Sequence, residues 1–250
     1  MNNDVKNKLL EYANRYETAD FIVGDPSWFM HQVEGDTNRE ATAFVASALS
    51  YGSRAQFMPK IQQLLDWADG DMDRWVRSGH FAERLRENDD NCFYRLYNCR
   101  TMNAFLRAYS GLLDQFGTLG RYVENSASTG HEAVQVITDW FAGHGGGCVV
   151  PHDASSACKR VCMFLRWMVR DNSPVDLGLW SRFIDRRSLI MPLDTHVLQQ
   201  SCRLGLLNSK TASMGAARKL TAALAEVFPD DPLRGDFALF GYGVNSQSDR

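Results

Sequence analysis

Apolar residues along the chain recur with the spacing of an α-helix, and the alternation that is typical of strands is nearly absent. Residues 38–67 predict two helices that are joined near Tyr51. Residues 101–117 and 131–147 predict two more, and the second of these ends in a run of glycines, which cannot sustain a helix. The pattern therefore predicts an all-α fold of short helices joined by turns.

A further helix is predicted over residues 158–170, CKRVCMFLRWMVR. Ser155 or Ser156 can cap this helix, which we expect to begin near Ala157. Its large apolar side chains form one stripe, made of Val161, Phe164, Leu165 and Met168.

The opposite side of this helix is predicted to be basic. At about 100° per residue, Lys159, Arg166 and Arg170 fall on that side. Two interpretations stay open: the basic side is an ordinary solvated face, or it borders a cleft that receives an anion.

An aspartate stands at the head of another apolar-striped segment, PLDTHVLQQSCRLGLL, which covers residues 192–207. Asp194 follows directly after a Met-Pro-Leu turn, and Thr195 and His196 come next. Two roles compete for Asp194: a helix cap, or a catalytic carboxylate held at the end of a helix. The two roles are compatible, because a capping carboxylate points out of the helix end.

The composition is that of an ordinary globular protein, with 250 residues of which 44% are hydrophobic and 23% charged. No apolar run is long enough to span a membrane and the N-terminal residues are polar, so we expect a cytoplasmic protein without a membrane partner. A chain of this length needs no disulfide staples, so we expect its 6 cysteines to be free thiols. The histidines show no ligand spacing, and no metal site is predicted.

The net charge of -3 argues against a protein that coats nucleic acid through its overall charge. Residues 158–190, however, hold seven basic and three acidic residues, so this segment carries +4 and the rest of the chain -7. The positive charge is concentrated beside the segment that contains Asp194.

The segment around Asp194 resembles the "VDTHV...RLGL" segment of the helix-hairpin-helix DNA glycosylases. In that superfamily a lysine at the start of the second hairpin helix precedes the aspartate, and Lys159 has the matching place. The resemblance extends over roughly residues 37–207, including FVASALSYGSRAQFMPKIQQLL. The runs KRVCMFLRWMVR, VDLGLW, LIMPLDTHV and DFALFGYGV also resemble an uncharacterised bacterial family, over most of the chain.

The resemblance implies a two-lobed helical fold, with a central lobe over residues 37–155 and a second lobe formed by 1–36 and 156–250. It implies a glycosylase that removes a damaged base, such as an oxidised purine, from double-stranded DNA, with possible lyase activity at the resulting abasic site. Lys159 would be the nucleophile and Asp194 its carboxylate partner. A lysine in the first helical turn lies at the positive end of the helix dipole, which disfavours an ammonium and helps to make a nucleophile.

Other residues are assigned by the same resemblance. Thr195 and His196 would support the site. The residues predicted to contact DNA are Ser155, Ser156, Arg160, Arg166 and Arg170.

The sequence departs from the superfamily in three respects. The hairpin lacks the paired glycines whose backbone amides grip a DNA phosphate, because it reads VVPHDASSACKR. The spacing from Lys159 to Asp194 is closest to that of the archaeal 8-oxoguanine glycosylases. No cysteine follows Cys202, so we expect no iron-sulfur cluster and no other cofactor. The alternative function is a catalytically inactive nucleic-acid-binding or protein-binding module of the same fold.

Overall fold

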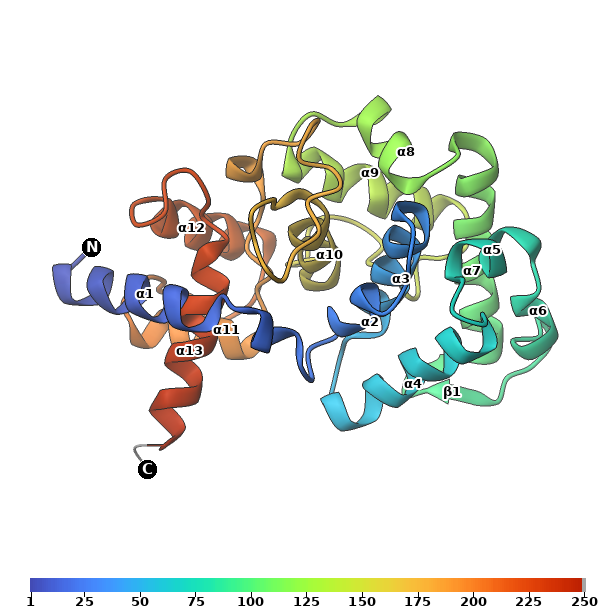
Figure 1. The fold of residues 1–250 in the computed structure, drawn as a ribbon, viewed down its shortest axis with the longest axis horizontal. Helices are drawn as coiled ribbons and strands as arrows, with labels where there is room; N and C mark the ends of the chain where they lie inside the picture. The colour runs from blue at the N-terminus through green and yellow to red at the C-terminus, as the bar shows by residue number, and fades with distance from the viewer. Residues whose placement is uncertain (249–250) are drawn as a thin grey trace. The chain divides into compact units, whose positions relative to one another are not determined.

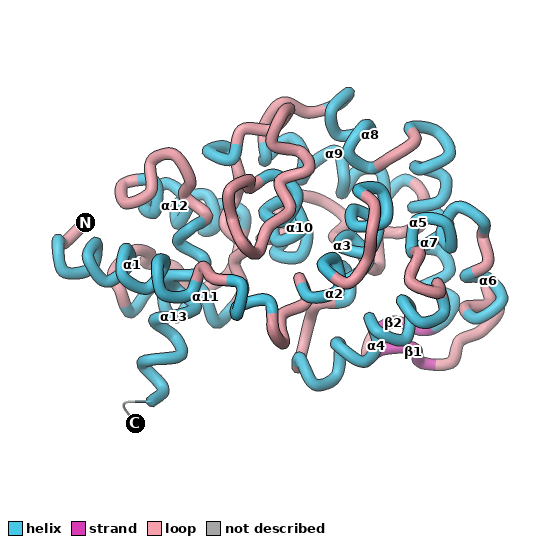
Figure 2. Tube along the Cα trace, viewed as in Figure 1, coloured by secondary structure: helices cyan, strands magenta, loops and turns pink. Residues whose placement is uncertain are grey.

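The computed structural model describes residues 1–248, and its regular secondary structure is almost entirely helical, as Figures 1 and 2 show. This confirms the predicted all-α class. A short antiparallel hairpin, of β1 (Cys92–Tyr94) and β2 (Tyr97–Asn98), is the only sheet among the described residues. The α-helices are α1 (Asn3–Tyr16), α2 (Trp28–His31), α3 (Asp36–Leu49), α4 (Arg54–Trp67), α5 (Met72–Ser78), α6 (Phe81–Arg84), α7 (Cys99–Phe116), α8 (Leu119–Ser126), α9 (Gly130–Gly143), α10 (Lys159–Val169), α11 (Thr195–Arg203), α12 (Met214–Ala225) and α13 (Arg234–Ser248).

The chain divides into two compact units. Unit 1 consists of residues 1–23, 128–131 and 154–250, and unit 2 consists of residues 24–127 and 132–153. The lobes expected from the sequence divide the chain after residues 36 and 155, whereas the main divisions between the units fall after residues 23 and 153. Residues 24–36 therefore belong with the helices that follow them.

Unit 2 is built around α3, which is buried along nearly its whole length. Phe44 of α3 packs against Tyr109 of α7 and Phe141 of α9, with ring centroids 4.9 and 5.1 Å away. The two helices predicted over residues 38–67 are α3 and α4, so that prediction is confirmed. The break between them lies at residues 50–53, as the Tyr-Gly-Ser sequence indicates.

Unit 1 holds α1 together with α10–α13, and Figure 1 shows α1 lying beside α13. The two helices approach closely at Gly241, where a Cβ atom would come within 2.3 Å of the Tyr16 ring. Tyr16 also meets Phe240 edge to face, with centroids 5.7 Å apart. The N-terminal helix is thus packed against the last helix of the chain.

None of the described helices combines the length and the apolar character that crossing a membrane requires. The six cysteines are free thiols, as predicted.

Candidate functional site at the junction of α10, α11 and α13

The first turn of α10 follows an unusual backbone conformation. Cys158, which is 2% exposed, precedes the helix with φ 44° and ψ 37°, in the left-handed region that residues with a side chain rarely adopt. No side chain caps the helix. The prediction that Ser155 or Ser156 caps it from Ala157 onward is therefore wrong: both serines are exposed, and Ser156 instead forms an isolated antiparallel bridge with Ser213.

Lys159 is the first residue of α10, so it lies in the first helical turn, as predicted. Its side chain is half-buried, and its Nζ donates a hydrogen bond to the thioether sulfur of Met163, 3.5 Å away. Among the described residues no carboxylate lies within ion-pair distance of this nitrogen. Lys159 thus presents an amine whose protein partner is a weak acceptor. Arg160, the next residue and a predicted DNA contact, is half-buried as well.

The rest of α10 is buried on all sides, which contradicts the predicted basic face. Arg166 and Arg170 are 3% and 1% exposed. Both are paired with carboxylates inside the protein, so they are not available to DNA phosphates and their assignment as DNA contacts is wrong. The error arose because the apolar stripe of α10 indicates a helix whose opposite side faces water. The sequence does not reveal that carboxylates from distant segments cover that side.

The two arginines share Asp176, whose side chain is fully buried. Arg166 reaches one of its oxygens at 3.2 Å and Arg170 pairs with the other. Arg170 also makes a two-pronged contact with Asp231, at 2.9 and 2.8 Å, and pairs with Glu17 of the N-terminal segment. Such planar, multiply bonded contacts suit a guanidinium, which is the cation best adapted to burial.

Charge and burial act in opposite directions in this network. Burial raises the pKa of Asp176, and the guanidinium groups of Arg166 and Arg170 oppose that rise. Burial alone would lower the pKa of Arg170, but Asp176, Asp231 and Glu17 raise it above its usual value. Arg170 is accordingly a permanent buried cation, fixed in place by three carboxylates.

Asp194 caps α11, as predicted. Its Oδ1 accepts a hydrogen bond from the backbone N–H of Val197 at 2.9 Å. Thr195 and His196, which follow it, are exposed. His196 lies against α13, because a Cβ atom at Gly243 would come within 2.6 Å of its Nε2.

Asp236, in the first turn of α13, is the site residue that the sequence did not reveal. It pairs with Arg166 of α10, and its helix packs against α11 two turns later, at Gly243. Burial raises the pKa of Asp236, Arg166 and Lys159 oppose that rise, and the negative charge of Asp194 adds to it. Helix α13 thus contacts both helices that carry the predicted pair, α10 through Asp236 and α11 at Gly243.

The candidate site therefore consists of one amine and two carboxylates, contributed by three helices of unit 1. Lys159 and Asp194 form no ion pair with each other in the part of the chain that the structure describes. The amine donates to Met163 instead, and the carboxylate accepts from Val197. A signal for Asp236 exists in the sequence, as the acidic residue at the head of DFALFGYGV, but no pattern there points to chemistry.

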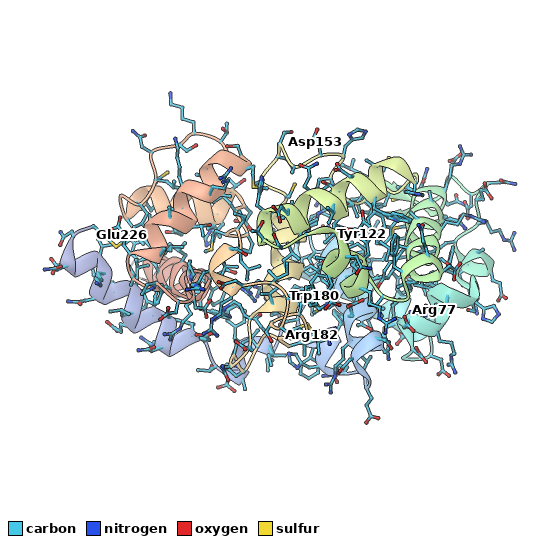
Figure 3. The ribbon with its side chains drawn as sticks, turned by 90° about the horizontal axis from the view of Figure 1, so that it is seen from above. Arg77, Tyr122, Asp153, Trp180, Arg182 and Glu226 are labelled. Carbon is cyan, nitrogen blue, oxygen red and sulfur yellow. The ribbon has the colours of Figure 1, made fainter. Side chains whose placement is uncertain are left out.

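The loop between α10 and α11 lines a separate pocket of about 560 Å³, which does not include the three site residues. Figure 3 labels Trp180 and Arg182, which belong to this loop. Arg182 lines the pocket, and Trp180 is buried.

The positive charge counted over residues 158–190 is largely neutralised by ion pairs. In the loop, Arg186 pairs with Asp171 and Arg187 with Asp185. The two arginines inside α10 are neutralised as described above. The segment therefore offers much less free positive charge than its sequence suggests.

Residues 25–245 match the model of a family described as "Protein of unknown function (DUF2400)". This agrees with the expected resemblance to an uncharacterised family over most of the chain. No curated protein and no solved structure matches the chain.

Proposed function

The chain belongs to the DUF2400 family, and from its own site we propose that it is a DNA N-glycosylase with lyase activity, acting on a damaged base such as an oxidised purine. The observation that carries the proposal is that α13 joins the two helices that begin at the predicted pair. Its Asp236 pairs with Arg166 of α10, which begins at Lys159, and its Gly243 lies against His196 of α11, which Asp194 caps. An amine in the first turn of one helix and a carboxylate capping another are the two groups that this chemistry requires.

The proposed reaction uses Lys159 as nucleophile. Its neutral amine attacks C1′ of the damaged nucleotide, and the bond between C1′ and the base breaks. The base departs with that electron pair and takes one of the two protons of the attached lysine nitrogen. The nitrogen lone pair then expels O4′ from C1′, O4′ takes a proton from solvent, and the opened sugar is left with an iminium linkage. Removal of a proton from C2′ then expels the 3′ phosphate. The charge of Asp194 stabilises the cationic sugar in the first step.

Borohydride trapping tests this proposal, because reduction of the iminium leaves a stable covalent adduct of protein and DNA. The substrates are duplexes containing 8-oxoguanine or an abasic site. We expect an adduct with the wild-type protein and none with Lys159→Gln. Lys8→Gln is the matched control, because Lys8 is an exposed lysine on α1 of the same unit and should trap like the wild type.

Asp194→Asn separates the two roles of Asp194. Asparagine caps a helix about as well as aspartate, so the melting temperature should stay close to that of the wild type. The charge is lost, however, and we expect the trapping rate to fall by roughly 100-fold or more. An Asp194→Asn protein that traps normally would limit Asp194 to capping.

Absence of any adduct with the wild-type protein on the abasic duplex would overturn the lyase proposal. If Lys159→Gln and Asp194→Asn then also bound DNA as the wild type does, the chain would be a binding module of this fold without the chemistry.

A further inference from the structure

The segment from Thr195 to Ala225 contains no acidic residue and has four basic ones. These are Arg203, Lys210, Arg218 and Lys219. The segment comprises α11, the loop that follows it, and α12. Its charge is thus not offset by nearby residues of the sequence, in contrast to the arginines of residues 158–190.

The structure leaves these side chains exposed. Arg218 and Lys219 lie on the exposed side of α12, and Lys210 is in the loop just before the helix. Among the described residues none of these three cations has a carboxylate within ion-pair distance. Glu226, labelled in Figure 3, is the next acidic residue, after the end of α12, and it pairs with the N-terminal amine.

This basic side adjoins the start of α10. Ser156 is bridged to Ser213, the N-cap of α12, and the backbone N–H of Met214 points to the carbonyl of Ser155. The first turns of α10 and α12 are therefore tied together, so that Lys159 is three residues from the bridge. The positive ends of both helix dipoles add to the charge of the side chains there.

We infer that Lys210, Arg218 and Lys219, with the adjoining Ser155–Ser156 segment, form the surface that holds the phosphate backbone of duplex DNA. The exposed cations supply the sequence-independent attraction that such binding requires. The surface takes the place of the paired-glycine hairpin that this chain lacks. This inference rests on the proposed function for the identity of its partner.

Binding of an undamaged, fluorescently labelled duplex tests the surface without any chemistry. The variant is the triple substitution Lys210→Gln, Arg218→Gln and Lys219→Gln. We expect its affinity to fall about tenfold or more at moderate salt. The slope of log K against log salt concentration should become shallower by roughly 0.9 for each phosphate that the variant no longer neutralises, or about 2 to 3 in all.

The matched control is Lys6→Gln, Lys8→Gln and Arg15→Gln on α1, which removes the same total charge from exposed positions of the same unit. It should keep the wild-type slope. Equal losses in both triple variants would overturn the inference, because overall charge would then account for the binding. Loss of binding to anionic lipid vesicles, with DNA binding intact, would assign the surface to a membrane and overturn it as well.

The outcome is independent of the trapping experiment. If the triple variant traps DNA normally and binds it with unchanged affinity, the proposed function is retained and the proposed DNA-binding surface is wrong. If the wild-type protein forms no adduct but the triple variant shows the predicted change in salt slope, the surface is supported and the proposed enzymatic activity is wrong. Circular dichroism and thermal unfolding of the triple variant should match the wild type, since all three side chains are exposed.

Discussion

Asp236 ties the first turn of α13 to α10 through Arg166. Arg166 is 3% exposed and pairs with Asp176 as well, so its guanidinium contacts carboxylates from two different segments. Burial raises the pKa of Asp236, and the positive charge of Arg166 opposes that rise. Asp236 therefore joins two helices of the site through a charge pair removed from water.

Asp236→Asn should destabilise the protein. Arg166 would keep its pair with Asp176 but lose its second carboxylate, and a hydrogen bond between charged groups typically contributes about 1.5–3 kcal/mol. Urea unfolding followed by circular dichroism measures this loss.

Asp236→Glu decides whether that loss is electrostatic. It keeps the charge that pairs with Arg166, so it should retain more of the wild-type stability than Asp236→Asn. An Asp236→Glu protein that is no more stable than Asp236→Asn would show that the Asp236 side chain contributes through its shape instead of its charge.

The two carboxylates of the site differ in how far the sequence reveals them. The position of Asp194 after a turn and before an apolar stripe predicts a cap, and its hydrogen bond to Val197 confirms it. The role of Asp236 depends on Arg166 of another helix, 70 residues earlier in the chain. No local pattern reveals that contact, because it forms only when α10 and α13 pack together.

For helix α10, the sequence predicts the position of the helix well and its surroundings poorly. Its existence and extent follow from the spacing of its apolar residues, and the structure confirms both to within one or two residues. Its surroundings do not follow. A basic side opposite an apolar stripe usually faces water, but here Asp176, Asp231, Asp236 and Glu17 cover it.

Arg170→Met should strongly destabilise the protein. The substitution leaves the buried Asp176 and the half-buried Asp231 without the guanidinium of Arg170, and such losses typically cost about 3–5 kcal/mol. Arg186→Met is the control, because its pair with Asp171 is partly exposed and should be worth less than about 1 kcal/mol. Urea unfolding followed by circular dichroism measures both, and equal effects would contradict the importance of the buried network.

Across unit 1, contacts between distant parts of the chain hold the site in place. Glu17 pairs with Arg170 and Arg234, which are 153 and 217 residues away in the sequence. The helical class could be predicted from the sequence because helices depend on neighbouring residues. The sequence does not predict which helices pack together, because those contacts join segments that carry no common pattern. For the same reason it does not predict the burial of Arg166 and Arg170 or the position of Asp236.

Glu17 should make the stability of the protein sensitive to acid. Burial would raise its pKa, but Arg170 and Arg234 lower it below the ordinary value of 4.5. A lowered pKa means that the folded state favours the ionised form, so this contribution is complete above about pH 4.5 and is lost as the pH falls through the folded pKa. Because solvent screens part of the interaction, Glu17→Gln should cost about 1 kcal/mol at pH 7 and progressively less below about pH 4.5. Denaturant unfolding at a series of pH values measures the difference, with Glu11→Gln, an exposed position on α1, as the control. A difference that stays constant from neutral to acidic pH would show that the Glu17 side chain contributes through packing instead of charge.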